Sequence, residues 1–226
     1  MNSDNRLSEQ FFSAIAEGDT GCLKALLDKN PPLAGAVNEA GLSALMFAAY
    51  HRQAGVIDTL RQSGPELDVF EAAAVGDTAR LGALLAAEPA AAHKISGDGF
   101  TAAHLAAFFA HPDCLGLLLD SGADASAVAD NPSRVQPLHS AVAGKSVAAA
   151  TLLLDAGARV NARQNGGWTP LHAAAHAGNE ALLGLLLTHG ADRGARADDG
   201  ATAITLARDA GSIGCQNLLS LAPDSE

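Results

Sequence analysis

Two histidines, His172 and His176, have a spacing that could present two imidazoles to one metal ion. Residues four apart share a helix face, and zinc hydrolases use this spacing with a glutamate between the histidines as the base. Here the three intervening residues are all alanine, and the pattern places no third ligand. We therefore expect no metal and no cofactor, and we keep a metal-dependent enzyme only as a remote alternative.

Three other short patterns resemble catalytic or ligand-binding motifs. Ser140 follows His139, but adjacent helical residues point about 100° apart and cannot form a nucleophile and base pair. Residues 97–102, GDGFTA, match the spelling of a dinucleotide-binding loop but follow no buried strand. Residues 198–200, DDG, lack the remaining ligands of a calcium loop. We assign no catalytic residue and expect that the protein is not an enzyme.

The stretch 167–192, GWTPLHAAAHAGNEALLGLLLTHGAD, explains these histidines as parts of a helix pair. Thr169 can cap a helix N-terminus, and Pro170 suits the first helical position. Gly178 ends this first helix, and a leucine-rich second helix follows and ends at Gly190. Helices of about ten residues do not persist alone in water. The unit therefore has to pack against neighbours like itself.

Six further stretches fit the same frame, in which small residues follow the position of His172 and a polar or glycine turn comes next. The residues at that position are Phe12, Met46, Phe70, His104, His139 and Thr205. A period of about 33 residues headed by Thr-Pro-Leu-His is typical of ankyrin repeats, and the chain resembles the ankyrin-repeat family from roughly Ser8 to Ala222. The resemblance implies an all-α solenoid of helix-turn-helix units joined by short hairpin-like finger loops.

The frame divides the chain into seven units between two short tails. The units are about 8–40, 41–64, 65–98, 99–133, 134–166, 167–199 and 200–222, with a polar N-terminal tail at 1–7 and a C-terminal tail at 223–226. The second unit ends at Gly64-Pro65, and its return to the next helix is shorter than the others. We therefore predict a gap or a change of curvature in the row of fingers between the second and third units.

Composition excludes several classes of partner. The net charge is −11 and the isoelectric point is about 5.0, which argues against binding to nucleic acid or to anionic lipid. No apolar run approaches the roughly 20 residues needed to span a bilayer, so we expect no membrane association. The N-terminal residues lack the basic start and apolar core of a secretory signal. We expect a cytoplasmic protein.

The aromatic residues are few and fall on one predicted surface. The chain has seven Phe, one Tyr and one Trp. On each first helix, the residues one, four and five places after the position of His172 face away from the stack. The resemblance implies that this side, with the residue before the helix-start Thr, forms a concave groove for partner proteins. The predicted partner-binding residues are Leu42, Phe47, Tyr50, His51, Phe100, Leu105, Phe108, Phe109, Trp168 and His176.

Six of the aromatics are in this set, and exposed aromatic patches usually mark binding sites. In the alternative interpretation, Phe47 and Leu105 tuck between neighbouring first helices and Phe100 covers the base of a finger. Four aspartates fall at or near the predicted finger tips: Asp98, Asp130 and the pair at 198–199. They predict a negative rim around the groove, which would favour a basic partner. In the alternative interpretation, these aspartates only form a solvated acidic surface and take no part in binding.

We therefore expect a monomeric, non-catalytic scaffold or adaptor that binds another protein, basic or neutral, through the groove. The alternative is a stoichiometric inhibitor or immunity protein that occludes a basic enzyme such as a nuclease.

Overall fold

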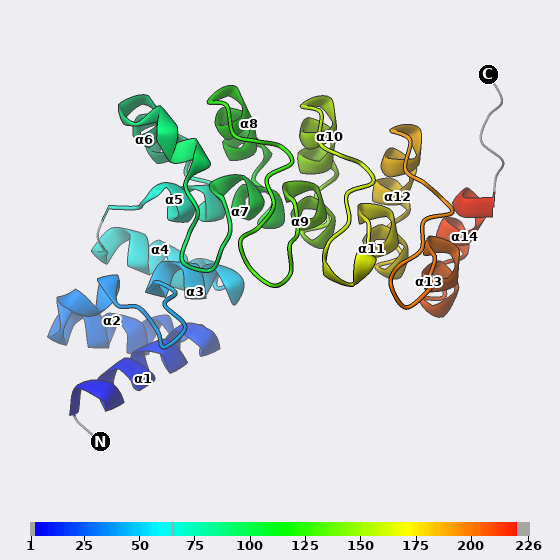
Figure 1. The fold of residues 1–226 in the computed structure, drawn as a ribbon. Coiled ribbons are helices and arrows are strands. Elements are labelled where there is room, and N and C mark those ends of the chain that lie inside the picture. Colours follow the sequence, from blue (N-terminus) through cyan, green and yellow to red (C-terminus); the bar gives the residue numbers. More distant parts are fainter. Residues whose placement is uncertain (1–2, 65, 221–226) are drawn as a thin grey trace.

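The computed structural model describes residues 3–64 and 66–220. In this part of the chain, fourteen α-helices follow one another in pairs that stack into an elongated solenoid (Figure 1). The helices are α1 (Ser3–Glu17), α2 (Thr20–Lys29), α3 (Ala44–Tyr50), α4 (Ala54–Ser63), α5 (Val69–Val75), α6 (Thr78–Ala87), α7 (Ala102–Phe108), α8 (Pro112–Asp120), α9 (Pro137–Ala143), α10 (Val147–Asp155), α11 (Pro170–His176), α12 (Glu180–Thr188), α13 (Ala203–Asp209) and α14 (Ile213–Ser220). Three 3-10 helices lie in the connections: η1 (Pro31–Gly35), η2 (Pro89–His93) and η3 (Asn165–Gly167). The expected all-α solenoid is confirmed.

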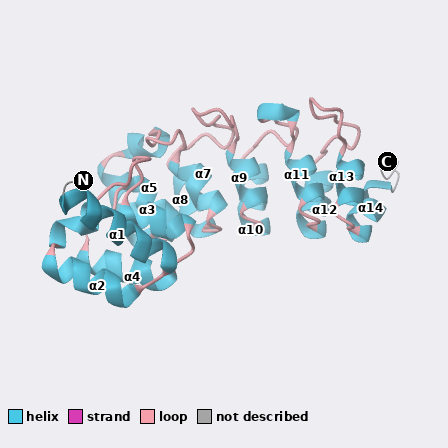
Figure 2. Cartoon of the chain, turned by 90° about the horizontal axis from the view of Figure 1, so that it is seen from below, coloured by secondary structure: helices cyan, strands magenta, loops and turns pink. Residues whose placement is uncertain are grey.

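The helices form two layers, with connecting loops that project from one side (Figure 2). The first helices of the pairs pack against one another, from α1 through α13, and the second helices form the other layer. Leucines from both layers fill the space between them, as expected for helices that bury one face. The fully buried leucines include Leu81, Leu115, Leu138, Leu153, Leu171 and Leu182.

Threonine and histidine side chains organise the starts of α7 and α11. Thr101 Oγ1 lies 2.8 Å from His104 Nδ1, and the Thr101 backbone N–H donates to the same nitrogen at 3.2 Å. His104 Nε2 lies 3.1 Å from the carbonyl oxygen of Val135 in the next loop. Thr169 and His172 repeat this arrangement. Each histidine therefore connects the start of its helix to the finger loop before the next first helix, α9 for His104 and α13 for His172.

The projecting loops bond to one another along the stack. The N–H of Asp130 donates to the carbonyl of Gly99 at 2.8 Å, and the N–H of Asp198 donates to that of Gly166 at 3.0 Å. Single β-bridges close three of the loops, at Val37 and Ser43, Ile95 and Thr101, and Arg196 and Thr202. These are the finger loops that the sequence indicates.

The stacking changes between α4 and α5. Every second helix packs closely on the next one along the described chain, except that α4 and α6 do not. Figure 1 shows α1–α4 set at an angle to the row that begins with α5. Most of the buried core is divided at the same place, with one cluster from Phe11 to Leu60 and a larger one from Val69 to Leu219, and a small cluster of Met46, Ala74 and Leu105 crosses the junction. The described residues of the connection, Gly64 and 66–68, form no β-bridge, so the predicted break in the finger row is present.

The N-terminal boundary differs from the prediction. Helix α1 begins at Ser3, so most of the expected polar tail at 1–7 is helical. The physical reason is Leu7, which packs against the N-terminal core cluster and gives the extra turn an apolar contact. The expected tail at 223–226 lies outside the described residues. The division into seven units stays a prediction.

Candidate functional site

A hollow of about 530 Å³ opens on the side of the first helices that faces away from the second helices. We call it the hollow. Its lining comes mainly from α7, α9 and α11 and from the loops that precede them. The lining residues are Tyr50, Phe100, His104, Leu105, Phe108, Ser133, Val135, His139, Ser140, Val142, Ala143, Lys145, Gln164, Trp168, Ala173, His176 and Ala177. The volume lies in the range of ligand-binding clefts, and most of the lining is apolar.

The hollow exists because α9 presents small side chains between bulky neighbours. Ser140 and Ala143 of α9 occupy the places that Leu105 and Phe108 fill on α7. On the far side, Trp168 packs edge-on against His176, with ring centroids 5.4 Å apart. Phe108 and Trp168 therefore form two aromatic walls over a floor of small residues.

Tyr50 closes one end of the hollow from two helix pairs away. Its ring lies 6.1 Å from that of Phe108 and 5.2 Å from that of Phe109. The Tyr50 hydroxyl donates to Asp98 Oδ2 at 3.3 Å. Burial raises the pKa of Tyr50 well above its usual range, and the charge of Asp98 acts in the same direction, because both disfavour the phenolate. The hydroxyl therefore stays a donor, and the small Ala74 of the intervening α5 leaves room for the contact.

The structure brings together six of the ten predicted partner-binding residues. Tyr50, Phe100, Leu105, Phe108, Trp168 and His176 line the hollow. The tyrosine, the tryptophan and both phenylalanines are half-buried, and His176 is exposed. The expected exposure of Leu105 is wrong. It is 2% exposed and packs with Met46 and Ala74, because Tyr50 and Phe109 cover it.

The other four predicted residues lie elsewhere. Leu42 lines a separate depression between two finger loops. Phe47 is half-buried and packs edge-on against Phe12, with centroids 5.4 Å apart, as the alternative interpretation expects. His51 is exposed beside Phe47. Phe109 lines a second cavity of about 370 Å³ behind Phe108. Their binding roles stay predictions.

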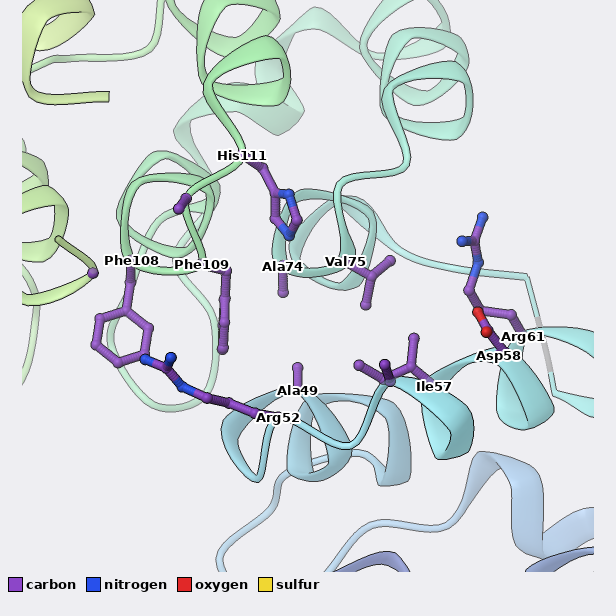
Figure 3. Close-up of a pocket in the computed structure, with 13 residues that line it drawn as sticks. Ala49, Arg52, Ile57, Asp58, Arg61, Ala74, Val75, Phe108, Phe109 and His111 are labelled. Carbon is purple, nitrogen blue, oxygen red and sulfur yellow. The ribbon is translucent and has the colours of Figure 1, made fainter. Parts of the chain in front are cut away.

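Figure 3 shows this second cavity, whose lining residues come from α3, α4, α5 and α7 and from the turns after α3, α7 and α9. Phe108 and Phe109 lie side by side, and the Arg52 side chain extends toward Phe108. Ile57 and Val75 supply apolar surface on the opposite side. Phe108 therefore separates two openings and contributes to both.

Lys145 belongs to the hollow and was missed by the sequence analysis. It lies in the turn between α9 and α10 with φ +57°, a backbone conformation that favours glycine. Arg52 occupies the equivalent turn after α3 with φ +56°. The sequence does contain a signal for both residues. Each is a cation at a turn position that is glycine in other units, as at Gly18 and Gly178.

The buried histidines serve the fold. Burial lowers the pKa of His104 and of His139 to about 4, because desolvation disfavours the imidazolium, while hydrogen bonds to backbone carbonyls act in the opposite direction. His172 is completely buried, with Nδ1 on Thr169 and Nε2 on the Ala201 carbonyl. Both of its nitrogens are therefore occupied, and it is not free to bind a metal with His176. No group of three metal-ligating side chains occurs within 3–64 and 66–220.

The finger rim carries both signs of charge. Arg163 forms an ion pair of 2.8 Å with Asp198, and Asp98 accepts the Tyr50 hydrogen bond. Arg134 and Arg196 also lie in these loops. The predicted negative rim is thus interrupted by arginines. No helix among the described residues combines the length and apolar character required to cross a bilayer.

Stacked helix pairs, finger loops and a hollow along the first helices define a helical-repeat solenoid. A family model described as "Ankyrin repeats (3 copies)" matches residues 69–164 and 138–225. The chain belongs to the ankyrin-repeat family. The match begins at Val69, so α1–α4 lie outside it.

Two curated proteins are similar over the repeats. "E3 ubiquitin-protein ligase KEG" of Arabidopsis thaliana is 31% identical over 156 residues, which cover 64% of this chain and 9% of that protein. "Neurogenic locus Notch protein" of Drosophila melanogaster is 37% identical over 133 residues, which cover 57% of this chain and 4% of that protein. The chain spans less than a tenth of either relative, so the similarity concerns a repeat region of each.

Proposed function

We propose that this ankyrin-repeat protein is a non-catalytic scaffold that binds another protein through the hollow. The single observation that supports this most is the hollow itself, an apolar cleft walled by half-buried aromatic side chains from α3, from α7 and from the loop before α11. Trp and Tyr are favoured anchors in protein interfaces because they bury a large apolar area and keep a polar atom at the edge. We also propose that the protein is a monomer and that it acts in the cytoplasm.

The test is to fill the hollow without changing the fold. Ala143 is exposed at the end of α9 and lines the hollow, so Ala143→Phe would occupy it. Ala181→Phe on α12 is the matched control, because Ala181 is exposed and lines none of the cavities described above. Affinity capture with chemical cross-linking should recover a protein with wild type and Ala181→Phe but not with Ala143→Phe. Recovery of the same proteins with all three chains would contradict the proposal.

The alternative of a stoichiometric inhibitor or immunity protein rests on the net charge of −11, which would attract a basic enzyme. An inhibitor forms one tight complex that abolishes an enzyme's activity in proportion to the amount added. A scaffold leaves its partner active. Measuring the activity of the captured partner with and without this chain separates the two functions.

A further inference from the structure

The charge lining the hollow differs from that of the whole chain. The net charge is −11, yet no residue that lines the hollow is acidic, and Lys145 lies at its edge. Within 3–64 and 66–220, Lys145 makes no ion pair or side-chain hydrogen bond. A cation without a carboxylate beside an apolar cleft favours a ligand that brings its own carboxylate.

The backbone at Lys145 supports a role in binding. Each turn between paired helices contains one residue with positive φ. In four of these turns the residue is a glycine: Gly18, Gly76, Gly178 or Gly211. Lys145 adopts the same conformation at φ +57°, where a side chain strains the backbone. Strained positions of this kind concentrate at ligand-binding sites. Ala110 is a further exception at φ +61° and carries no charge.

A second cation lies behind the aromatic wall. Arg52 has φ +56°, and Figure 3 shows its side chain extended toward Phe108. Among the described residues, Arg52 forms no ion pair. Asp98, next to the aromatic cluster, already accepts hydrogen bonds from Tyr50 and from Ser96. Lys145 and Arg52 therefore place a cation without an ion pair on each side of Phe108, and the second cavity also contains the carboxylate of Asp58.

The shape of the site favours a length of polypeptide over a compact small molecule. Phe108 lines both the hollow and the second cavity, and Leu105 lines both the hollow and the depression beside Leu42. The three openings therefore lie next to one another along the first helices, divided by Phe108 and Leu105. An extended ligand can place one side chain in the hollow while its neighbours follow this surface.

We propose that the hollow binds a segment of a partner protein in which a bulky apolar side chain is followed or preceded by a carboxylate. The apolar side chain lies between Phe108 and Trp168, and the carboxylate pairs with Lys145. This inference rests on the proposed function and names the chemistry of the partner at that site.

The first test selects ligands without prior choice. A random peptide library displayed on phage is selected on the wild-type chain after depletion on Ala143→Phe. Enrichment of a Leu, Ile, Phe or Trp next to Asp or Glu is expected. Enrichment of Lys or Arg in place of the acid, or no enrichment at all, overturns the inference. An apolar consensus without any charge preference also overturns it but leaves the proposed function standing.

The second test measures the contribution of the cation. Trp168 is the only tryptophan and lines the hollow, so its emission reports occupancy by the selected peptide, synthesised free of phage. Lys145→Gly should weaken binding about two- to fivefold, as loss of one exposed ion pair does, and added salt should reduce this difference. Gly211→Ala changes an equivalent turn that lines none of the cavities described above and should leave affinity unchanged. Equal affinity for wild type and Lys145→Gly overturns the inference.

Two other occupants have distinct signatures. A second copy of the chain would give a dimer in sedimentation that Ala143→Phe abolishes. A small amphiphile would give a Trp168 response to decanoate that the selected peptide does not displace. Either result overturns the assignment of a partner segment.

Discussion

The backbone of Gly144 lies directly against the carbonyl oxygen of Phe108, so that a Cβ at this glycine would overlap that oxygen. The contact joins the ends of α7 and α9, which are among the most closely packed helices of the array. It also fixes the distance between the Phe108 wall of the hollow and the small residues of α9.

Gly144→Ala should therefore destabilise the protein. Gly144 has φ −73°, which alanine adopts freely, so the change acts through the clash alone. We expect a loss of about 2–3 kcal/mol in the free energy of unfolding, as overpacking against backbone costs. Urea unfolding followed by circular dichroism measures it. Gly184→Ala in α12 is the control, because nothing lies within 4 Å of its Cβ, and it should stabilise by about 0.5–1 kcal/mol.

Lys145→Gly should stabilise the fold. Relief of the left-handed conformation at φ +57° is worth about 1 kcal/mol, less the entropy that glycine adds to the unfolded chain. Ala110→Gly should have a similar effect, and Gly178→Ala, at φ +62°, should have the opposite one. A loss of stability in Lys145→Gly would show that the lysine side chain contributes contacts to the fold.

Stability should fall between about pH 6.5 and pH 4. The pKa of His104 and His139 is about 4 in the folded chain, below the unfolded value near 6.5. In this window the unfolded state binds more protons, so stability rises with pH and is lost as pH decreases. Each histidine should account for on the order of 2–3 kcal/mol by pH 4. Urea unfolding against pH measures the slope, and a His104→Gln/His139→Gln variant should reduce it.

The Tyr50 hydroxyl should lose its proton at a higher pH than an exposed tyrosine does. It is the only tyrosine, so near-ultraviolet absorbance follows its phenolate without interference from other tyrosines. Because burial and Asp98 raise its pKa, the folded chain should show no transition near pH 10, the usual value of a tyrosine. The chain unfolded in urea should titrate near about pH 10. An ordinary pKa in the folded chain would mean that the Tyr50 ring is not covered by Phe108 and Phe109.

Tyr50→Phe separates the hydrogen bond from the ring. The ring contacts with Phe108 and Phe109 remain, and only the donation to Asp98 is lost. We expect a loss of about 1 kcal/mol. Tyr50→Ala should cost clearly more, because it also uncovers Leu105. Equal losses for the two variants would indicate that the aromatic contacts add little.

The sequence predicts local features well where one residue type decides them. Thr169 and Pro170 indicate the start of α11, and Gly178 indicates its end. The short connection after Gly64 correctly indicates a break in the finger row. In each case the cause lies within a few residues, in capping, backbone conformation or loop length.

The candidate site was harder to predict because it depends on neighbours far apart in the sequence. Leu105 occupies a position expected to be exposed, yet Tyr50, from two helix pairs earlier, covers it. That contact requires both the changed stacking after α4 and the small Ala74. Likewise, the hollow results from the absence of bulk at Ser140 and Ala143, a feature visible only when α9 is placed between α7 and α11.

The division of the buried core between α4 and α5 has a mechanical consequence. Neighbouring repeats hold one another only through their shared interface, and here the second helices contribute little to it. If the two ends of the protein are pulled apart, this interface should open first. Tyr50 would then leave with α3, while Phe108 and Trp168 would stay together on the longer part. Tension along the chain would thus remove one end of the hollow before it separates the two walls.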